Sequence, residues 1–100
     1  MTLTSFPKHK QVRLHGQALK KLVEAVYERD RGCCVNCHRP IEEGTKPHHV
    51  IFKSHGGGDT EDNLVMLCGS CHYAVHHGGN GKNIQDKCKR LLQFLYDNED

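Results

Sequence analysis

The sequence predicts an α+β fold in which a short β-hairpin and a helix form a small metal-binding core between an N-terminal and a C-terminal helix. Apolar residues recur at helical spacing near both ends of the chain, whereas the middle holds two C-x-x-C motifs and a dense group of histidines. Residues 48–77 contain six of the nine histidines and two of the six cysteines. This density of nitrogen and sulfur ligands predicts metal chemistry.

The composition favours one domain with a thin core, and we expect residues 17–100 to form it. Only 36% of the 100 residues are apolar and there is no Trp, so a metal cross-link is expected to help hold the chain folded. No apolar run approaches the roughly 20 residues that a membrane span requires. The first residues show no apolar signal segment, so we expect a cytoplasmic location in which the cysteines stay reduced.

Residues 1–16 are expected to form a basic arm without regular structure, because they show no hydrophobic periodicity. Residues 1–21 hold five basic and no acidic side chains, a local charge of +5. Lys8, Lys10 and Arg13 are therefore candidates for contact with the phosphates of a polyanion, although a merely solvated chain end would have the same composition.

The first helix is expected from Gln17 to Arg29 or Asp30. Apolar residues at positions 19, 22, 23 and 26 follow the i, i+3, i+4, i+7 spacing of an amphipathic helix, and Gly32 is a suitable stop. Charged residues occupy the opposite face, so we expect this helix to serve as scaffold.

The two C-x-x-C motifs predict a structural zinc site. Cys34 and Cys37 can supply two thiolates to one tetrahedral ion, and Cys68 and Cys71 can supply the other two. The 30 residues between the motifs exceed the spacing of a compact zinc ribbon, so a further structure must be inserted there. Cys33 could replace Cys34 as the zinc ligand, but the C-x-x-C spacing favours Cys34.

The insertion predicts a hairpin. Residues 48–52, HHVIF, are prone to β-structure, and successive side chains of a strand face opposite ways, so His48 and His49 are expected to differ in role, one on a metal and one facing a substrate. The three glycines that follow must form a loop, and residues 64–67 would be the return strand. Asn63 precedes it, and its amide could tie the loop backbone together or serve only as a turn residue.

Residues 68–77 are expected to form a short helix that presents two histidines to one ion. His72 and His76 are four residues apart and therefore share one face of a helix. With His48 from the strand they would give three nitrogen ligands and leave positions on the metal open for water and substrate. That is a catalytic rather than a closed arrangement.

The last helix is expected over residues 83–97, after a flexible link over residues 78–83. Asn83 is a suitable N-cap, and an apolar stripe follows at helical spacing. Cys88 lies in this stripe and is expected to be a small core residue rather than a metal ligand. The aromatic residues near the end, Phe94 and Tyr96, are expected to pack on the first helix or to serve a partner surface.

The combined pattern resembles the HNH endonuclease family, whose core is the ββα-metal fold. The resemblance covers residues 29–77 and rests on Cys34-x-x-Cys37, His48-His49, Gly57 to Asp59, Asn63-Leu64, Cys68-x-x-Cys71-His72 and His76. The positions that give the family its name correspond to His49, Asn63 and His72. The spacing of Asn63, His72 and His76 is also similar to that of the colicin-type nucleases.

The resemblance implies that His48, His72 and His76 hold one divalent ion, that His49 is the general base, and that Asn63 orients the loop or His49. The ion would stabilise the leaving 3′ oxygen, and the products would carry 5′-phosphate and 3′-hydroxyl ends. Many family members have Asp in place of His48. Because imidazole ligands suit Zn, Ni, Co or Mn better than Mg, several metals stay open as the catalytic ion.

The predicted function is therefore metal-dependent cleavage of DNA, by nicking or by double-strand cleavage, with low intrinsic sequence specificity. Lys53 and His77 are weaker candidates for contact with DNA. The resemblance further implies phage or prophage partners such as the packaging terminase, and it leaves the oligomeric state open. The alternative is a non-catalytic zinc module that binds nucleic acid or protein, which explains the cysteines but neither histidine pair.

Overall fold

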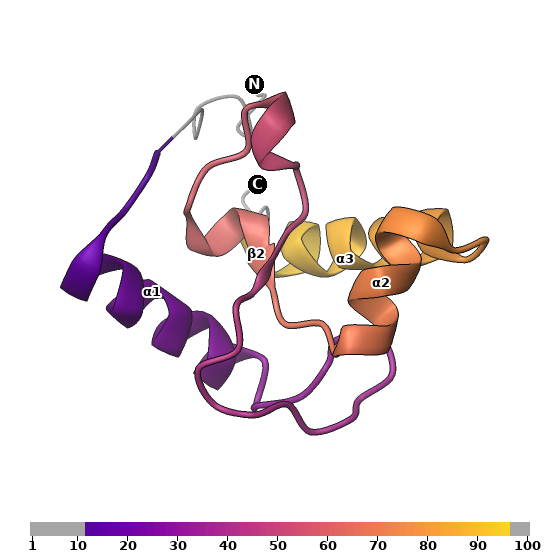
Figure 1. The fold of residues 1–100 in the computed structure, drawn as a ribbon, viewed down its shortest axis with the longest axis horizontal. Coiled ribbons are helices and arrows are strands. Elements are labelled where there is room, and N and C mark those ends of the chain that lie inside the picture. Colours follow the sequence, from indigo (N-terminus) through magenta and orange to yellow (C-terminus); the bar gives the residue numbers. More distant parts are fainter. Residues whose placement is uncertain (1–11, 97–100) are drawn as a thin grey trace.

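Within residues 12–96, which the computed structural model describes, three α-helices surround a two-stranded antiparallel hairpin. The elements are α1 (Gly16–Arg29), β1 (His48–His49), η2 (Lys53–His55), η3 (Glu61–Asn63), β2 (Leu64–Val65), α2 (Gly69–His77) and α3 (Gly81–Tyr96). Figure 1 shows α1 on one side of the hairpin, and α2 and α3 together on the other. The predicted α+β class with a small ββα core is confirmed. None of the helices in this part of the chain could span a membrane.

The first helix begins at Gly16, one residue before the expected start, and ends at Arg29 as expected. It runs to Arg29, and the chain then turns through Arg31 and Gly32, both at positive φ. The Arg29 guanidinium donates to the carbonyl oxygens of Glu61 (2.7 Å) and Leu64 (2.6 Å), so the end of α1 is fixed to the second half of the hairpin.

The hairpin strands are shorter than expected. In register, His48 faces Val65 and His49 faces Leu64, and β1 stops at His49 rather than reaching residue 52. The reason is that side chains replace the strand ladder: Asn63 Oδ1 accepts from the backbone N–H of Ile51 (2.7 Å). On the other strand, the N–H of Met66 donates to the carboxylate of Asp30 (2.9 Å), which ends β2 before residue 67.

The C-terminal helix begins two residues before the expected start, at Gly81, and Asn83 is not its N-cap. Gly81 lies so close to α2 that a Cβ there would be 2.7 Å from the carbonyl oxygen of Ala74. The link is therefore only residues 78–80. Of the two aromatic residues, Phe94 is 78% exposed and does not pack on α1, whereas the Tyr96 hydroxyl lies 3.2 Å from Arg29 of that helix.

The core lies beneath the hairpin and is closed by one buried face of each long helix. Its members are Val26, Cys34, Ile41, Val50, Leu64, Val65, Met66, Leu67, Cys71, Ile84, Cys88 and Leu92. Cys88 belongs to this core, as the apolar stripe of the last helix predicts. The hairpin residues of the site therefore lie next to buried core residues, Leu64 and Val65 of β2 among them.

We predict that Gly57→Ala destabilises the fold by about 3 kcal/mol, because overpacking against backbone cannot relax by a rotamer change. A Cβ at residue 57 would collide with the carbonyl oxygen of Ile51 and lie 2.9 Å from the amide nitrogen of Asn63. The measurement is thermal unfolding of the zinc-loaded protein. Gly79→Ala is the control, because a Cβ there meets nothing within 4 Å. Equal melting temperatures for the two variants would contradict this account of the loop.

Candidate active site

The two C-x-x-C motifs converge into one cluster of four sulfur atoms. The Sγ atoms of Cys34, Cys37, Cys68 and Cys71 all lie within 4.8 Å of one another, and those of Cys37 and Cys68 are 3.6 Å apart. Four thiolates at about 2.3 Å from a tetrahedral zinc ion would be separated by about 3.8 Å. Cys33 lies outside the cluster and its thiol donates to the carbonyl oxygen of Arg31. The geometry therefore suits a closed, four-coordinate zinc site with Cys34 as a member.

Hydrogen bonds to sulfur lower the pKa of Cys34, whereas burial raises the pKa of Cys71 to about 12. The Asn36 side-chain amide donates to Cys71 Sγ (3.3 Å), and the backbone N–H of Cys37 donates to Cys34 Sγ (3.5 Å). Burial raises the pKa of Cys34, but the backbone donors of Cys37 and Cys68 outweigh it and lower the pKa to about 7. One ligand is therefore already close to a thiolate near neutral pH, which is the form that binds metal.

We predict that Cys34→Ser removes the zinc and unfolds the domain, because the thin core cannot hold the two motifs together alone. Cys33→Ser is the matched control. It changes a neighbouring thiol whose one hydrogen bond within residues 12–96 is to the Arg31 carbonyl, and it should keep one zinc per chain. Zinc content and thermal unfolding are the measurements. If Cys33→Ser were the variant that lost zinc, the assignment of Cys34 would be wrong.

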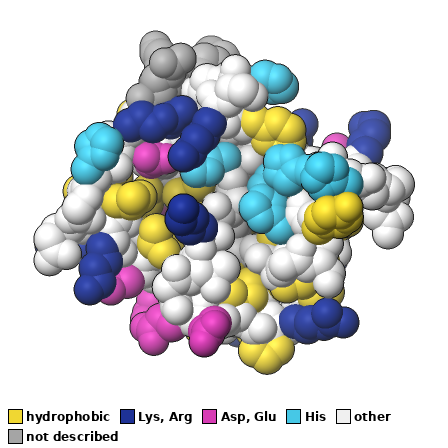
Figure 2. Space-filling model, in the orientation of Figure 1, with side chains coloured by type: hydrophobic (Ala, Val, Ile, Leu, Met, Phe, Trp, Pro, Cys, Tyr) yellow, Lys and Arg dark blue, Asp and Glu magenta, His cyan; other side chains and the backbone are white. Residues whose placement is uncertain are grey.

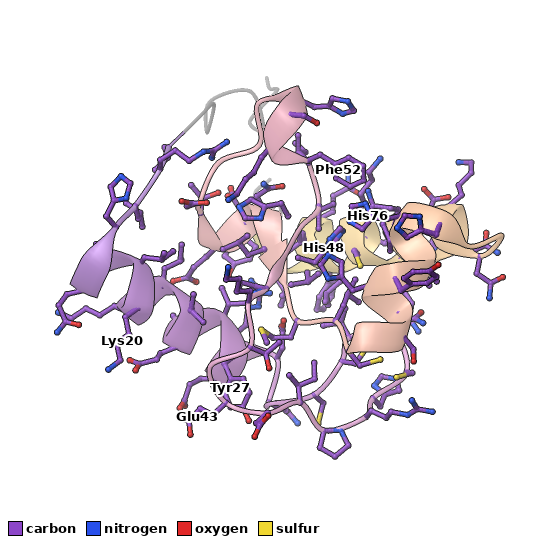
Figure 3. The ribbon with its side chains drawn as sticks, viewed as in Figure 1. Lys20, Tyr27, Glu43, His48, Phe52 and His76 are labelled. Atoms are coloured by element: carbon purple, nitrogen blue, oxygen red, sulfur yellow. The ribbon has the colours of Figure 1, made fainter. Side chains whose placement is uncertain are left out.

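A second cluster of ligands lies between the hairpin and α2. One ring nitrogen from each of His48, His72 and His76 lies within 4.8 Å of the others, with ring centroids 5.0 to 5.8 Å apart. Figure 3 shows His48 from the hairpin and His76 from α2 approaching each other, with Phe52 beside them. Phe52 packs on the His76 ring at 5.0 Å. The structure thus brings together the three histidines that the sequence proposes as ligands.

The surroundings of His48 and His72 keep these two imidazoles in the form that binds a cation. Burial lowers the pKa of His48 to about 4, and the hydrogen bond with Gln85 offsets this only in part. The pKa of His72 is also lowered, first by burial and then by the neighbouring His76. Neutral imidazoles present a lone pair to a metal rather than a proton, so the donor set fits a divalent ion that accepts nitrogen.

Gln85 on α3 is a residue of this site that sequence reasoning did not find. Its side-chain Nε2 donates to the carbonyl oxygen of Val50 (3.0 Å), so the other end of the amide, Oε1, is the acceptor that faces His48 Nε2 at 2.8 Å. This fixes the proton of His48 on Nε2 and leaves Nδ1 as its free nitrogen. No sequence signal points to Gln85, because it lies 37 positions from its partner on a separate helix.

His49 is not a member of the three-histidine cluster and pairs with an acid. Its Nε2 lies 2.8 Å from Asp59 Oδ1. Asn63 is buried beneath the same loop, where its amide nitrogen donates to the carbonyl oxygens of Ile51 and Gly58, both at 3.1 Å. The structure therefore gives Asn63 contacts that hold the loop, and it gives His49 an acidic partner. Asp59 belongs to the family pattern in the sequence, but the sequence alone does not indicate that Asp59 pairs with His49.

Both arrangements open into one cleft of about 380 Å³. Its residues are Leu19, Val23, Lys46, Pro47, His48, His49, Phe52, Lys53, Asp59, Leu64, His72 and His76. Leu19 and Val23 of α1 form an apolar wall, while Lys46 and Lys53 supply positive charge. Figure 2 shows this face, on which histidines gather beside basic side chains. The cleft can accept an anionic ligand next to a proton acceptor and three metal ligands.

The residues predicted to contact DNA do not lie together in the structure. Arg13 donates to the carbonyl oxygen of Gly57 (2.7 Å), so the described part of the arm is bound to the glycine loop rather than loosely attached. Lys53 lines the cleft, whereas His77 lies outside the three-histidine cluster, on the exposed surface of α2 beside Tyr73. Lys8 and Lys10 lie outside the described residues.

The sequence around this cleft is similar to that of known endonucleases. Residues 34–78 match the sequence profile of the HNH endonucleases. The chain is 35% identical over 80 residues to the Type IV methyl-directed restriction enzyme EcoKMcrA of Escherichia coli, a match covering 73% of this chain and 26% of that protein. It is 46% identical over 39 residues to the probable mobile endonuclease C of Enterobacteria phage T4, a match covering 39% of this chain and 19% of that protein. The chain thus spans about a quarter and about a fifth of these two relatives.

Proposed function

Because the chain belongs to the HNH endonuclease family, we propose that it is an endonuclease that hydrolyses phosphodiester bonds of DNA with the help of one divalent metal ion. The observation that carries this proposal is the shared cleft in which His49 lies beside the cluster of His48, His72 and His76. A non-catalytic zinc module would need the four cysteines but would have no use for a second, partly open set of ligands.

The three histidines would hold the catalytic ion, and the four cysteines a structural zinc. The all-nitrogen donor set favours Mn, Co, Ni or Zn over Mg, which prefers oxygen ligands. When bound, a divalent ion supplies positive charge to a non-bridging phosphate oxygen and to the departing 3′ oxygen. His48 is 2% exposed and is held by Gln85, so it would fix where the ion sits relative to the hairpin.

His49 would act as the general base. It would take a proton from the water whose oxygen attacks phosphorus, and the bond to the 3′ oxygen would break, giving 5′-phosphate and 3′-hydroxyl ends. Asn63 would act through the backbone, since its contacts with Ile51 and Gly58 keep the loop that borders His49 in one conformation. Both residues thus keep the roles that the family resemblance implies.

Binding of DNA would rest on charge more than on reading of bases. Lys46 and Lys53 line the cleft and would contact backbone phosphates, so affinity should fall steeply with salt and discriminate little between sequences. The named relatives are a restriction enzyme and a probable mobile endonuclease. Partnership with a packaging terminase stays a prediction from the sequence, and our proposal for the partner is DNA.

We predict that His49→Ala lowers the rate of supercoiled-plasmid cleavage by at least about 100-fold, the usual contribution of a general base. Nicked and linear products are followed with Mg, Mn, Co, Ni or Zn supplied at the three-histidine site. His15→Ala is the control, because His15 is exposed at the start of α1 and caps that helix with no side-chain hydrogen bond. A folded His49→Ala protein that cleaves at the wild-type rate would remove His49 from the role of base.

We predict that Gln85→Ala weakens metal binding at the three-histidine site by about 10- to 100-fold, because His48 loses the acceptor that fixes its tautomer. Calorimetric titration of Mn or Co into zinc-loaded protein measures this without reference to cleavage. Gln93→Ala changes an exposed glutamine of the same helix and should leave the affinity unchanged. Equal affinities for both variants would mean that Gln85 does not act on the metal site.

A further inference from the structure

A short N-terminal segment is bound to the glycine loop beside the site. The backbone N–H of Asp59 donates to the carbonyl oxygen of Val12 (2.8 Å), and the N–H of Leu14 donates back to Asp59 Oδ2 (2.9 Å). Arg13 adds a bond to the carbonyl oxygen of Gly57 (2.7 Å). We call Val12, Arg13 and Leu14 the N-terminal clasp. The clasp lies outside residues 34–78, the stretch that matches the family profile.

The clasp holds a buried carboxylate. Asp59 is 7% exposed, and its two oxygens have different partners: Oδ1 faces His49 Nε2 at 2.8 Å, and Oδ2 accepts from Leu14. The Arg13 guanidinium lies 3.9 Å from Oδ1. A buried carboxylate is costly unless it is paired and hydrogen-bonded, and here the pairing is divided between the clasp and His49.

We propose that Asp59 is a positioning residue for His49, and that the N-terminal clasp holds Asp59 in the place from which it does so. The inference rests on the proposed function, since it assigns a partner to the base of that reaction. It links the position of His49, through Asp59, to backbone hydrogen bonds of residues 12–14, which precede the first helix.

The chemistry of the pair follows from what a carboxylate can do. An ionised carboxylate only accepts hydrogen bonds, so the proton of His49 must sit on Nε2, and Nδ1 carries the free lone pair that could accept a proton from water. Burial raises the pKa of Asp59, but the hydrogen bonds from His49 and Leu14 and the charge of Arg13 outweigh it and lower the pKa overall. Asp59 therefore remains an acceptor at neutral pH.

Asp59 is not needed to hold the loop in the way that Asn63 is. The Asn63 amide already ties the loop to Ile51 on one side and to Gly58 on the other. The carboxylate of Asp59 instead bridges the backbone N–H of Leu14 and the imidazole of His49. Support of the loop alone would not require the contact between Asp59 Oδ1 and His49 Nε2, so this contact indicates a role in positioning the imidazole.

The first test compares Asp59→Asn with wild type by steady-state cleavage of a short DNA duplex. The amide keeps the size of the side chain but can also donate, so His49 is free to adopt either tautomer. We expect kcat to fall about 100-fold, with KM and zinc content unchanged. Asp86→Asn is the matched control, since Asp86 is a half-buried carboxylate of α3 that pairs only with Lys82 among the described contacts. A fall confined to KM, or no fall, in folded Asp59→Asn protein would overturn the inference.

The second test addresses the clasp and needs no change at Asp59. Leu14→Pro deletes the N–H that donates to Asp59 Oδ2, whereas Leu14→Ala keeps it. We expect kcat to fall about tenfold for the proline variant and to stay near wild type for the alanine variant. This pair decides the matter if Asp59→Asn does not fold. Equal kcat values for the two folded variants would show that the clasp does not act on the reaction.

A spectroscopic readout separates this inference from the proposed function. Nitrogen-15 NMR of the His49 ring should show the proton on Nε2 in wild type and a mixture of tautomers in Asp59→Asn, whether or not the protein cleaves DNA. A wild-type ring protonated on Nδ1 would overturn the inference and leave the nuclease intact. Absence of cleavage by wild-type protein with all five metals would instead remove the proposed function, and the catalytic role of Asp59 with it.

Discussion

Convergence of four cysteine thiols is the constraint on which the rest of the structure depends. The two motifs are separated by a long insertion, yet Cys37 and Cys68 lie 3.6 Å apart at its two ends. Everything that the site uses from the hairpin lies within this closed loop, and α2 starts directly from the second motif. With a core as thin as this one, a metal at the four sulfurs would supply the closure that apolar burial alone does not.

Backbone geometry gives the two hairpin histidines different neighbours. Successive residues of a strand face opposite ways, so His48 turns into the three-histidine cluster while His49 turns to Asp59. Helical spacing places His72 and His76 on one face of α2, where both approach His48. Each hairpin histidine then has a partner that depends on a segment outside the matched core. Gln85 of α3 faces His48, and Asp59, which accepts a hydrogen bond from Leu14, faces His49. The flanking segments therefore complete the site as well as covering it.

Sequence reasoning succeeded where the determining interaction is local. The pairs Cys34/Cys37 and His72/His76 are recognisable because their spacing alone brings the ligand atoms together. The strand lengths could not be predicted, because side chains distant in sequence, Asn63 and Asp30, replace the ladder. The start of α3 was missed because it depends on how closely Gly81 approaches α2. Partners such as Gln85 arise from tertiary packing, for which one sequence carries no periodic signal.

The most direct test of this account is anomalous diffraction from crystals of the protein with Mn or Co and a DNA duplex carrying a non-hydrolysable phosphate. We expect a zinc peak among the four cysteines and a separate Mn or Co peak among His48, His72 and His76. His49 should lie within reach of a water that faces the phosphorus, with Asp59 on its other nitrogen. A single peak at the cysteines, with DNA bound away from the cleft, would contradict the assignment of a catalytic site and favour a zinc-stabilised binding module.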